Sequence, residues 1–134
     1  MQKIGILNSR IAKVLADLGH TDKICVGECG LPVPSGTPKI DLALRLGEPK
    51  FIEVVKEMAK YMEIQKVYIA PETETENPEQ WKALHEVFPQ DTVEWVILDS
   101  HEELKAWEKD CKAVIRTGEI TPYSNIILES GVIF

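Results

Sequence analysis

The chain has 134 residues, the size of one ordinary domain built around one hydrophobic core. Hydrophobic residues make up 44% of it and charged residues 28%, enough for a buried core and a hydrated surface. The formal net charge of -7 argues against nucleic acid or an anionic membrane as a partner, because either would repel the protein.

No segment has the pattern of a targeting or membrane-spanning sequence. The N-terminus lacks the basic, apolar and cleavage regions of a signal peptide, and no stretch approaches the roughly 20 apolar residues that span a bilayer. The three cysteines, Cys25, Cys29 and Cys111, are an odd number without the spacing of a zinc finger. This favours reduced thiols in a cytoplasmic protein.

Helical periodicity begins near the N-terminus and returns three times. Apolar residues between positions 7 and 18 share one face, with Asn8 or Ser9 as the N-cap and Gly19 after the last turn. The acidic run Pro71–Glu79 lacks this periodicity and is expected to be a solvated loop. The later helices are predicted to begin at Pro49, at Asn77-Pro78 and at the S-x-x-E capping box of Ser100 and Glu103.

Short apolar runs between these helices predict the strands. In chain order they are residues 23–28, 40–44, 66–70, 93–98, 112–116, 126–128 and 131–134. The alternation predicts one domain over residues 1–134 of the α/β class: a Rossmann-like, largely parallel sheet flanked by helices. Because ligands bind beyond the carboxyl ends of the strands in such sheets, we expect the site in the connections at 20–28, 99–101 and 118–125.

Two histidines are candidates for acid–base chemistry or ligand binding. His20 follows the first helix, where a histidine is ordinarily a dipole-stabilised surface group; an ordinary histidine pKa of about 6.5 equally suits a general acid or base. His101 lies in the first turn of a helix, where the dipole disfavours a positive charge and a neutral ring can bond a hydroxyl group. Lys105 shares its face one turn later, so a solvated His–Lys edge is the alternative.

Glu28 ends an apolar strand and needs a polar partner there. A structural hydrogen bond to the nearby backbone is one interpretation. Cys25 and Cys29 flank this carboxylate and raise the possibility of a metal site, but structural zinc usually takes four ligands and no second pair is present. Small core residues are the favoured interpretation of these thiols.

The segment from Arg116 to Asn125 breaks the regular pattern, since Gly118 and Pro122 enforce a turn. Tyr123, Ser124 and Asn125 then supply hydroxyl and amide groups of the kind that recognise sugars, unless they form a strand edge that faces water. No phosphate-binding glycine loop, nucleophile elbow, zincin motif or dinucleotide fingerprint occurs, so proton transfer is the chemistry that remains.

Several of these runs together resemble the D-ribose pyranase family. The resemblance covers nearly the whole chain in order and is weakest around residues 71–92. It rests on Lys3–Ser9, Leu15–Ile24, Gly30–Pro34, Lys39–Leu42, Ser100–Lys105, Ala113–Glu119 and Thr121–Asn125.

This resemblance implies a cytoplasmic enzyme of ribose catabolism that interconverts the pyranose and furanose forms of D-ribose without a metal or organic cofactor. Family members form pentameric rings that pair into decamers, with active sites between neighbouring subunits. The implied partners are therefore D-ribose or a similar monosaccharide and further copies of the chain. The family's proton-donating histidine falls on His20, and its sugar ligands fall on Glu28, His101, Tyr123 and Asn125, with Lys105 and Ser124 in support.

One position departs from the family pattern, because Glu28 replaces an aspartate and is longer by one methylene. The related L-fucose mutarotase is one alternative activity, although the runs at 19–22 and 30–34 look more like the ribose branch. A non-catalytic sugar-binding module is the other, since the chain has no strong nucleophile or metal site.

Overall fold

Six short strands form one mixed sheet in the computed structural model, which describes every residue from 1 to 134. The strand order is β2-β5-β1-β6-β3-β4. Five strands run parallel, and β6 alone runs antiparallel to its neighbours β1 and β3. The predicted α/β class with a largely parallel sheet is confirmed. The strands are β1 (Lys23–Gly27), β2 (Lys39–Asp41), β3 (Ile64–Ile69), β4 (Glu94–Ile97), β5 (Ala113–Arg116) and β6 (Asn125–Ser130).

Three helices begin at capping residues that the sequence indicates, whereas the helix expected to begin at Pro49 begins at Phe51, after Lys50. The side chain of Asn8 accepts hydrogen bonds from backbone N–H groups of the first turn, and Asn77 and Ser100 do the same for two later helices. The helices are α1 (Ser9–Asp17), α2 (Phe51–Tyr61), α3 (Pro71–Glu76), α4 (Pro78–Val87) and α5 (His101–Trp107), which continues into the 3-10 turn η1 (Glu108–Asp110).

Two expectations about these elements are wrong. The run Pro71–Glu79 is not a loop, because its first six residues form α3, with Pro71 at the first helical position and Glu72 and Glu74 in the first turn. Residues 131–134 do not form a strand, since β6 takes all of the final pairing and ends at Ser130.

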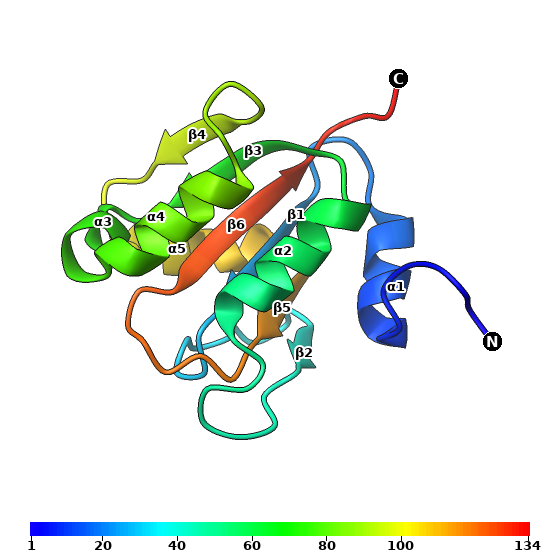
Figure 1. The fold of residues 1–134 in the computed structure, drawn as a ribbon, viewed down its shortest axis with the longest axis horizontal. Coiled ribbons are helices and arrows are strands. Elements are labelled where there is room, and N and C mark those ends of the chain that lie inside the picture. The colour runs from blue at the N-terminus through cyan, green and yellow to red at the C-terminus, as the bar shows by residue number, and fades with distance from the viewer.

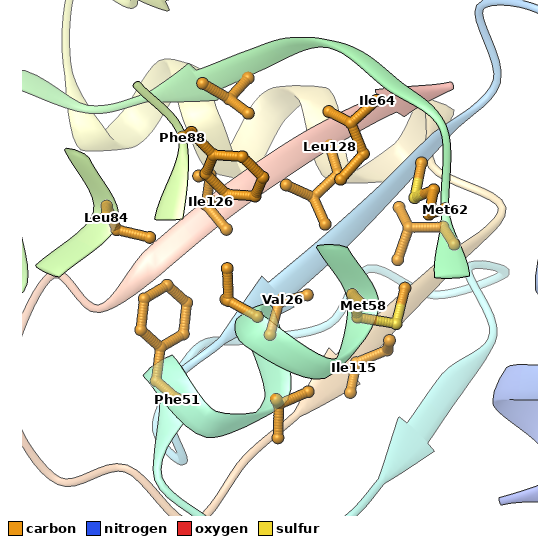
Figure 2. Packing of buried hydrophobic residues seen from close by; sticks show 14 of the residues in the cluster. Val26, Phe51, Met58, Met62, Ile64, Leu84, Phe88, Ile115, Ile126 and Leu128 are labelled. Carbon is orange, nitrogen blue, oxygen red and sulfur yellow. The ribbon is translucent and has the colours of Figure 1, made fainter. Parts of the chain in front are cut away.

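The main core lies between one face of the sheet and α2. Phe51 and Met58 of α2 are fully buried, and they share one cluster with residues of the central strands such as Val26 (Figure 2). The helices α2 and α4 cover this face, and α5 lies behind the sheet (Figure 1), where Leu104 belongs to a second buried cluster. The result is a three-layer arrangement of helices, sheet and helices.

The register of β1 against β6 defines the two ends of the sheet. Gly27 pairs with Asn125 at the end where the parallel strands finish, and Lys23 pairs with Glu129 at the opposite end. Since a strand rises about 3.3 Å per residue, roughly 13 Å separate these two ends of β1. No helix has the length and apolar character needed to span a bilayer.

Candidate active site

Glu28 and Asn125 meet directly where β1 ends and β6 begins. The backbone N–H of Glu28 donates to Oδ1 of Asn125 at 3.1 Å. The carboxylate of Glu28 accepts a bond of 2.6 Å from the N–H of Gly30, which curls the chain after the strand. Gly27 permits the approach, because a Cβ at that position would lie 2.8 Å from Oδ1 of Asn125.

The loop that carries Tyr123 and Asn125 is held from within by a buried carboxylate. Oε1 of Glu119 accepts from the N–H groups of Ile120 and Thr121 and from the Thr121 hydroxyl. Tyr123 adopts the left-handed conformation with φ of 56°, an uncommon state for a residue with a side chain, and its carbonyl accepts a bond from Thr73. The loop is therefore fixed in one shape by its own contacts.

Ser124 has a supporting place in this loop. Its hydroxyl is fully buried and bonds with the side-chain amides of Asn77 and Gln80 and the hydroxyl of Thr121. Those bonds tie the loop to the start of α4. The hydroxyl is fully occupied inside the protein, so Ser124 acts by holding its neighbours Tyr123 and Asn125.

His101 lies beside Tyr123 at the start of α5. The two rings meet edge to face with centroids 5.2 Å apart, and the backbone N–H of His101 donates to Oε1 of Glu72 at 3.0 Å. Burial, aided by the nearby Lys105 ammonium, lowers the pKa of His101 although Glu72, Glu102 and Glu28 oppose the shift. The ring is therefore neutral at neutral pH.

Lys105 stands one turn after His101, as expected from the helix periodicity. Its ammonium group pairs with Glu102 at 2.8 Å, and this hydrogen bond raises the pKa of Lys105. The charge remains close enough to act on the His101 ring. The positive charge of Lys105 therefore disfavours protonation of the His101 ring.

Three polar atoms near this end of the sheet are buried and lack a hydrogen-bond partner in the protein. They are Nδ1 of His101, Nδ2 of Asn125 and Oε2 of Glu72. Buried polar groups without partners are rare, and here they combine a donor, an acceptor and a ring nitrogen. A polyhydroxyl ligand, whose hydroxyl groups both donate and accept, would satisfy this mixture. We name Glu28, His101, Tyr123 and Asn125 the carboxyl-end cluster.

His20 does not belong to the carboxyl-end cluster. It precedes β1, at the end of the sheet where the C-terminal residues leave β6 (Figure 1), and Thr21 donates its N–H to the carbonyl of Ser130 there. The expectation that His20 joins the other site residues at the carboxyl ends of the strands is therefore wrong within one copy of the chain. The length of β1 separates His20 from Glu28.

The surroundings of His20 are apolar and open. A hollow of about 440 Å³ lies beside the ring, and its walls include Leu15, Leu18, Tyr61 and Phe134. The side chain of Phe134 is fully exposed. On the other side, Nε2 of His20 lies 3.0 Å from Oε1 of Gln65, which in turn contacts the buried Glu129.

Sequence reasoning missed Glu72, Gln65 and Glu129. Glu72 had a signal, because Pro71 followed by acidic residues marks a helix N-terminus after a strand. Gln65 and Glu129 had none, since each is an ordinary strand residue until β3 and β6 are known to be neighbours. The cysteines Cys25 and Cys111 are buried as core residues, and no three His, Cys, Asp or Glu side chains group in a manner that could hold a metal ion.

Known proteins match this chain along its full length. A model of the family described as the RbsD / FucU transport protein family matches residues 1–133. The D-ribose pyranases of Bacillus subtilis and Lactobacillus johnsonii are each 52% identical over 134 residues, covering all of both chains. The D-ribose pyranase of Lactococcus lactis is 55% identical over 132 residues, 98% of each chain.

Solved structures agree in fold. The structure of Bacillus subtilis RbsD complexed with D-ribose superposes with a TM-score of 0.96 over 100% of both chains, at 52% identity. The fucose mutarotase of Streptococcus pneumoniae, solved with L-fucose, has a TM-score of 0.77 at 19% identity over 96% of this chain and 95% of its own, so it shares the fold alone. The resemblance found in the sequence is thereby confirmed, and the chain belongs to the RbsD / FucU transport protein family.

Proposed function

We propose that this protein is an enzyme that interconverts the pyranose and furanose forms of D-ribose. The observation that carries the proposal is the match of the whole chain, at 52% identity and a TM-score of 0.96, to a protein solved with D-ribose. The unpartnered polar atoms of the carboxyl-end cluster support it, because they provide the donors and acceptors that sugar hydroxyls require. We place the reaction in the cytoplasm, at the entry of ribose into its catabolism.

The chemistry consists of proton transfers. On opening, the ring oxygen takes a proton from His20 while the anomeric hydroxyl releases one to water, and the free aldehyde forms. On closure, a different hydroxyl attacks the aldehyde carbon and gives its proton to His20, while the aldehyde oxygen takes a proton back from water and becomes the new anomeric hydroxyl, so protons balance over the cycle. A histidine suits this role because its ordinary pKa lies near neutral pH.

The carboxyl-end cluster holds the sugar during these steps. Asn125 offers its free Nδ2 donor and the neutral His101 ring offers Nδ1, while the carboxylate of Glu28 accepts from a hydroxyl. Tyr123 closes the site beside His101 and adds its phenol. The sugar is positioned by hydrogen bonds, so no metal or organic cofactor enters the mechanism that we propose.

A second copy of the chain completes the site. In one copy, His20 and the carboxyl-end cluster lie at opposite ends of β1. The apolar hollow beside His20, with the exposed Ile133 and Phe134, is a surface that a neighbouring subunit would cover. Contact between the His20 end of one copy and the carboxyl-end cluster of the next is head to tail, which closes into a ring. We propose paired pentameric rings as the assembly.

Saturation-transfer NMR on D-ribose tests the function. The protein should accelerate exchange between pyranose and furanose signals, and His20→Ala should remove most of that acceleration. His85→Ala serves as the matched control, because His85 lies on α4, stacked on Trp95, and plays no part in the proposal. Ribose-induced shifts in the protein without faster exchange would indicate a binding module, and faster exchange of L-fucose than of ribose would indicate a mutarotase.

A further inference from the structure

Gln65 of β3 connects His20 to a buried anion. Its Oε1 lies 3.0 Å from Nε2 of His20, and its Nε2 donates at 2.7 Å to Oε1 of Glu129 on β6. The two contacts use both ends of one side-chain amide. The residues come from the α1–β1 connection, β3 and β6, which the sheet order brings together.

Glu129 is ionised, and its hydrogen bonds hold the side chain in one orientation. It is only 4% exposed, and its other oxygen accepts from the Tyr68 hydroxyl and from the Lys23 ammonium at 2.9 Å. Burial alone would raise the pKa of Glu129, but the hydrogen bonds from Tyr68, Gln65 and Lys23 hold it at about 2. A carboxylate in this state only accepts hydrogen bonds.

The carboxylate therefore dictates which way the Gln65 amide faces. Only the NH₂ group can donate to Glu129, so the carbonyl oxygen must face His20. A carbonyl oxygen can only accept, so Nε2 of His20 must carry a hydrogen in both the neutral and the charged ring. Nδ1 makes no hydrogen bond in the protein, so it is the ring nitrogen that can be protonated and deprotonated.

We propose that Gln65 is a positioning residue that holds the neutral His20 ring as the Nε2–H tautomer and leaves Nδ1 as the atom that exchanges protons with the sugar. This inference rests on the proposed role of His20 in ring opening. Glu129 acts behind Gln65 by orienting the amide, and Tyr68 and Lys23 act behind Glu129.

Two substitutions at position 65 separate this role from a merely structural one. Gln65→Met keeps the length of the side chain but removes its acceptor. Gln65→Glu keeps an acceptor for the ring, and its second oxygen must share one proton with the ionised Glu129 that it faces. Gln90→Met is the matched control, because Gln90 is exposed in the turn after α4. Other charged groups near His20 stay unchanged in all three variants, namely Glu63 and Asp22, the latter bonded to Gly19 and Lys112.

The first readout is the tautomer of His20, measured on the full-length protein above the titration of the ring by long-range ¹H–¹⁵N correlation NMR. The unmodified protein, Gln90→Met and Gln65→Glu should each show the Nε2–H form alone, and Gln65→Met should show both tautomers. An unchanged tautomer in Gln65→Met, with its fold verified by the amide spectrum, would overturn the proposal.

The second readout is the rate of pyranose–furanose exchange as a function of pH. The exchange rate of Gln65→Met at its optimum pH should be about tenfold lower than that of the unmodified protein. The reason is that the Nδ1–H tautomer has no free Nδ1 to accept a proton from the sugar. Gln65→Glu keeps an acceptor for Nε2–H and should retain activity to within about threefold of the unmodified protein. A Gln65→Glu rate as low as that of Gln65→Met would contradict the proposed contact.

The two readouts keep the inference apart from the function on which it rests. If the unmodified protein fails to accelerate ring exchange, the proposed function is wrong, and the tautomer spectra still decide whether Gln65 orients His20. If exchange is fast but neither the tautomer nor the rate responds to Gln65→Met, the function stands and the positioning role is wrong.

Discussion

The backbone N–H of Glu28 donates a hydrogen bond to the side chain of Asn125, 97 positions further along the chain. This contact exists because β6 runs antiparallel to β1, so the beginning of one strand lies beside the end of the other. If β6 ran parallel to the other strands, its first residue would lie at the opposite end of the sheet from Glu28. The reversal of β6 is what delivers Tyr123 and Asn125 to the ends of the parallel strands, next to Glu28 and His101.

The activity should depend more on the negative charge of residue 28 than on the length of its side chain. Glu28→Gln keeps the size of the side chain and an acceptor for the N–H of Gly30, but it gives up a charge-assisted bond to the sugar, which is about twice as strong as a neutral one. We expect kcat/KM for ring exchange to fall about tenfold, mainly through KM. Glu28→Asp retains the charge and should lose less.

Saturation-transfer rates at several ribose concentrations measure this difference. Glu86→Gln on the exposed side of α4 is the control for the loss of one negative charge from the protein. Equal kcat/KM values for Glu28→Gln and the unmodified enzyme would show that the carboxylate makes no contact with the sugar.

Ribose affinity should depend on pH through His101. Burial first, and then the Lys105 charge, lower the pKa of His101 below its usual value of 6.5. The ring is consequently neutral above that value, and affinity should be constant there and decline only in acid, when Nδ1 becomes protonated and stops accepting. Lys105→Met removes this positive charge, so the ribose affinity of the variant should begin to decline at a higher pH.

The titration of His101 can be followed directly by NMR in the protein without sugar. Lys82→Met, an exposed lysine on α4, removes the same charge far from the ring and should leave the His101 titration unmoved. A Lys105→Met protein whose His101 titrates as in the unmodified chain would refute the electrostatic coupling.

Local sequence signals account for most of the fold. Asn8, Asn77 and Ser100 are capping residues whose side chains act on backbone groups two or three positions away, so they are readable without tertiary structure. The helix α3 differs from the expected solvated loop because its acidic residues stand in the first turn behind Pro71, where they complement the helix dipole.

The candidate site was predictable in its residue types but not in its geometry. Position in the chain suggested that His20 and Glu28 share one connection, although β1 lies between them and carries them to opposite ends of the sheet. The contacts of Gln65 with His20 and Glu129 span 45 and 64 positions. Such contacts depend on strand order, which the pattern of apolar residues does not encode.

Glu108 should make the protein less stable as pH rises. Its side chain is fully buried in η1 with neither carboxylate oxygen hydrogen bonded, and burial raises the pKa of Glu108 to about 7, against an ordinary value of 4.5. The folded state thus binds the proton more tightly than the unfolded chain. The associated stability is complete below about pH 4.5 and is lost as pH rises through 7.

Glu108→Gln removes the ionisation while keeping the shape of the side chain. Since one pKa unit corresponds to 1.36 kcal/mol, the variant should gain about 3 kcal/mol in free energy of unfolding at pH 8 relative to pH 4.5. Urea unfolding at both pH values, at one fixed protein concentration, measures this gain. A difference between variant and unmodified protein that is the same at both pH values would show that Glu108 ionises normally.

Two inactive variants should restore activity when they share an assembly. His20→Ala and His101→Ala each disable every site of a homogeneous oligomer if one site takes His20 from one copy and the carboxyl-end cluster from the next. After the two are unfolded together and refolded at equal amounts, about one quarter of the sites combine an intact His20 with an intact His101. Ring exchange should therefore recover to about a quarter of the unmodified rate.

The same experiment discriminates between a shared site and a site within one copy. If His20 acted on a sugar bound to its own copy, every site in the mixture would still lack one of the two histidines, and the mixture would be as inactive as its components. A double variant, His20→Ala with His101→Ala, mixed with unmodified protein provides the reference for random assembly. Within each chain, His20 and His101 lie at opposite ends of the sheet, separated by roughly 13 Å along β1. Activity recovered in the mixture of the two single variants can therefore arise only from contact between copies.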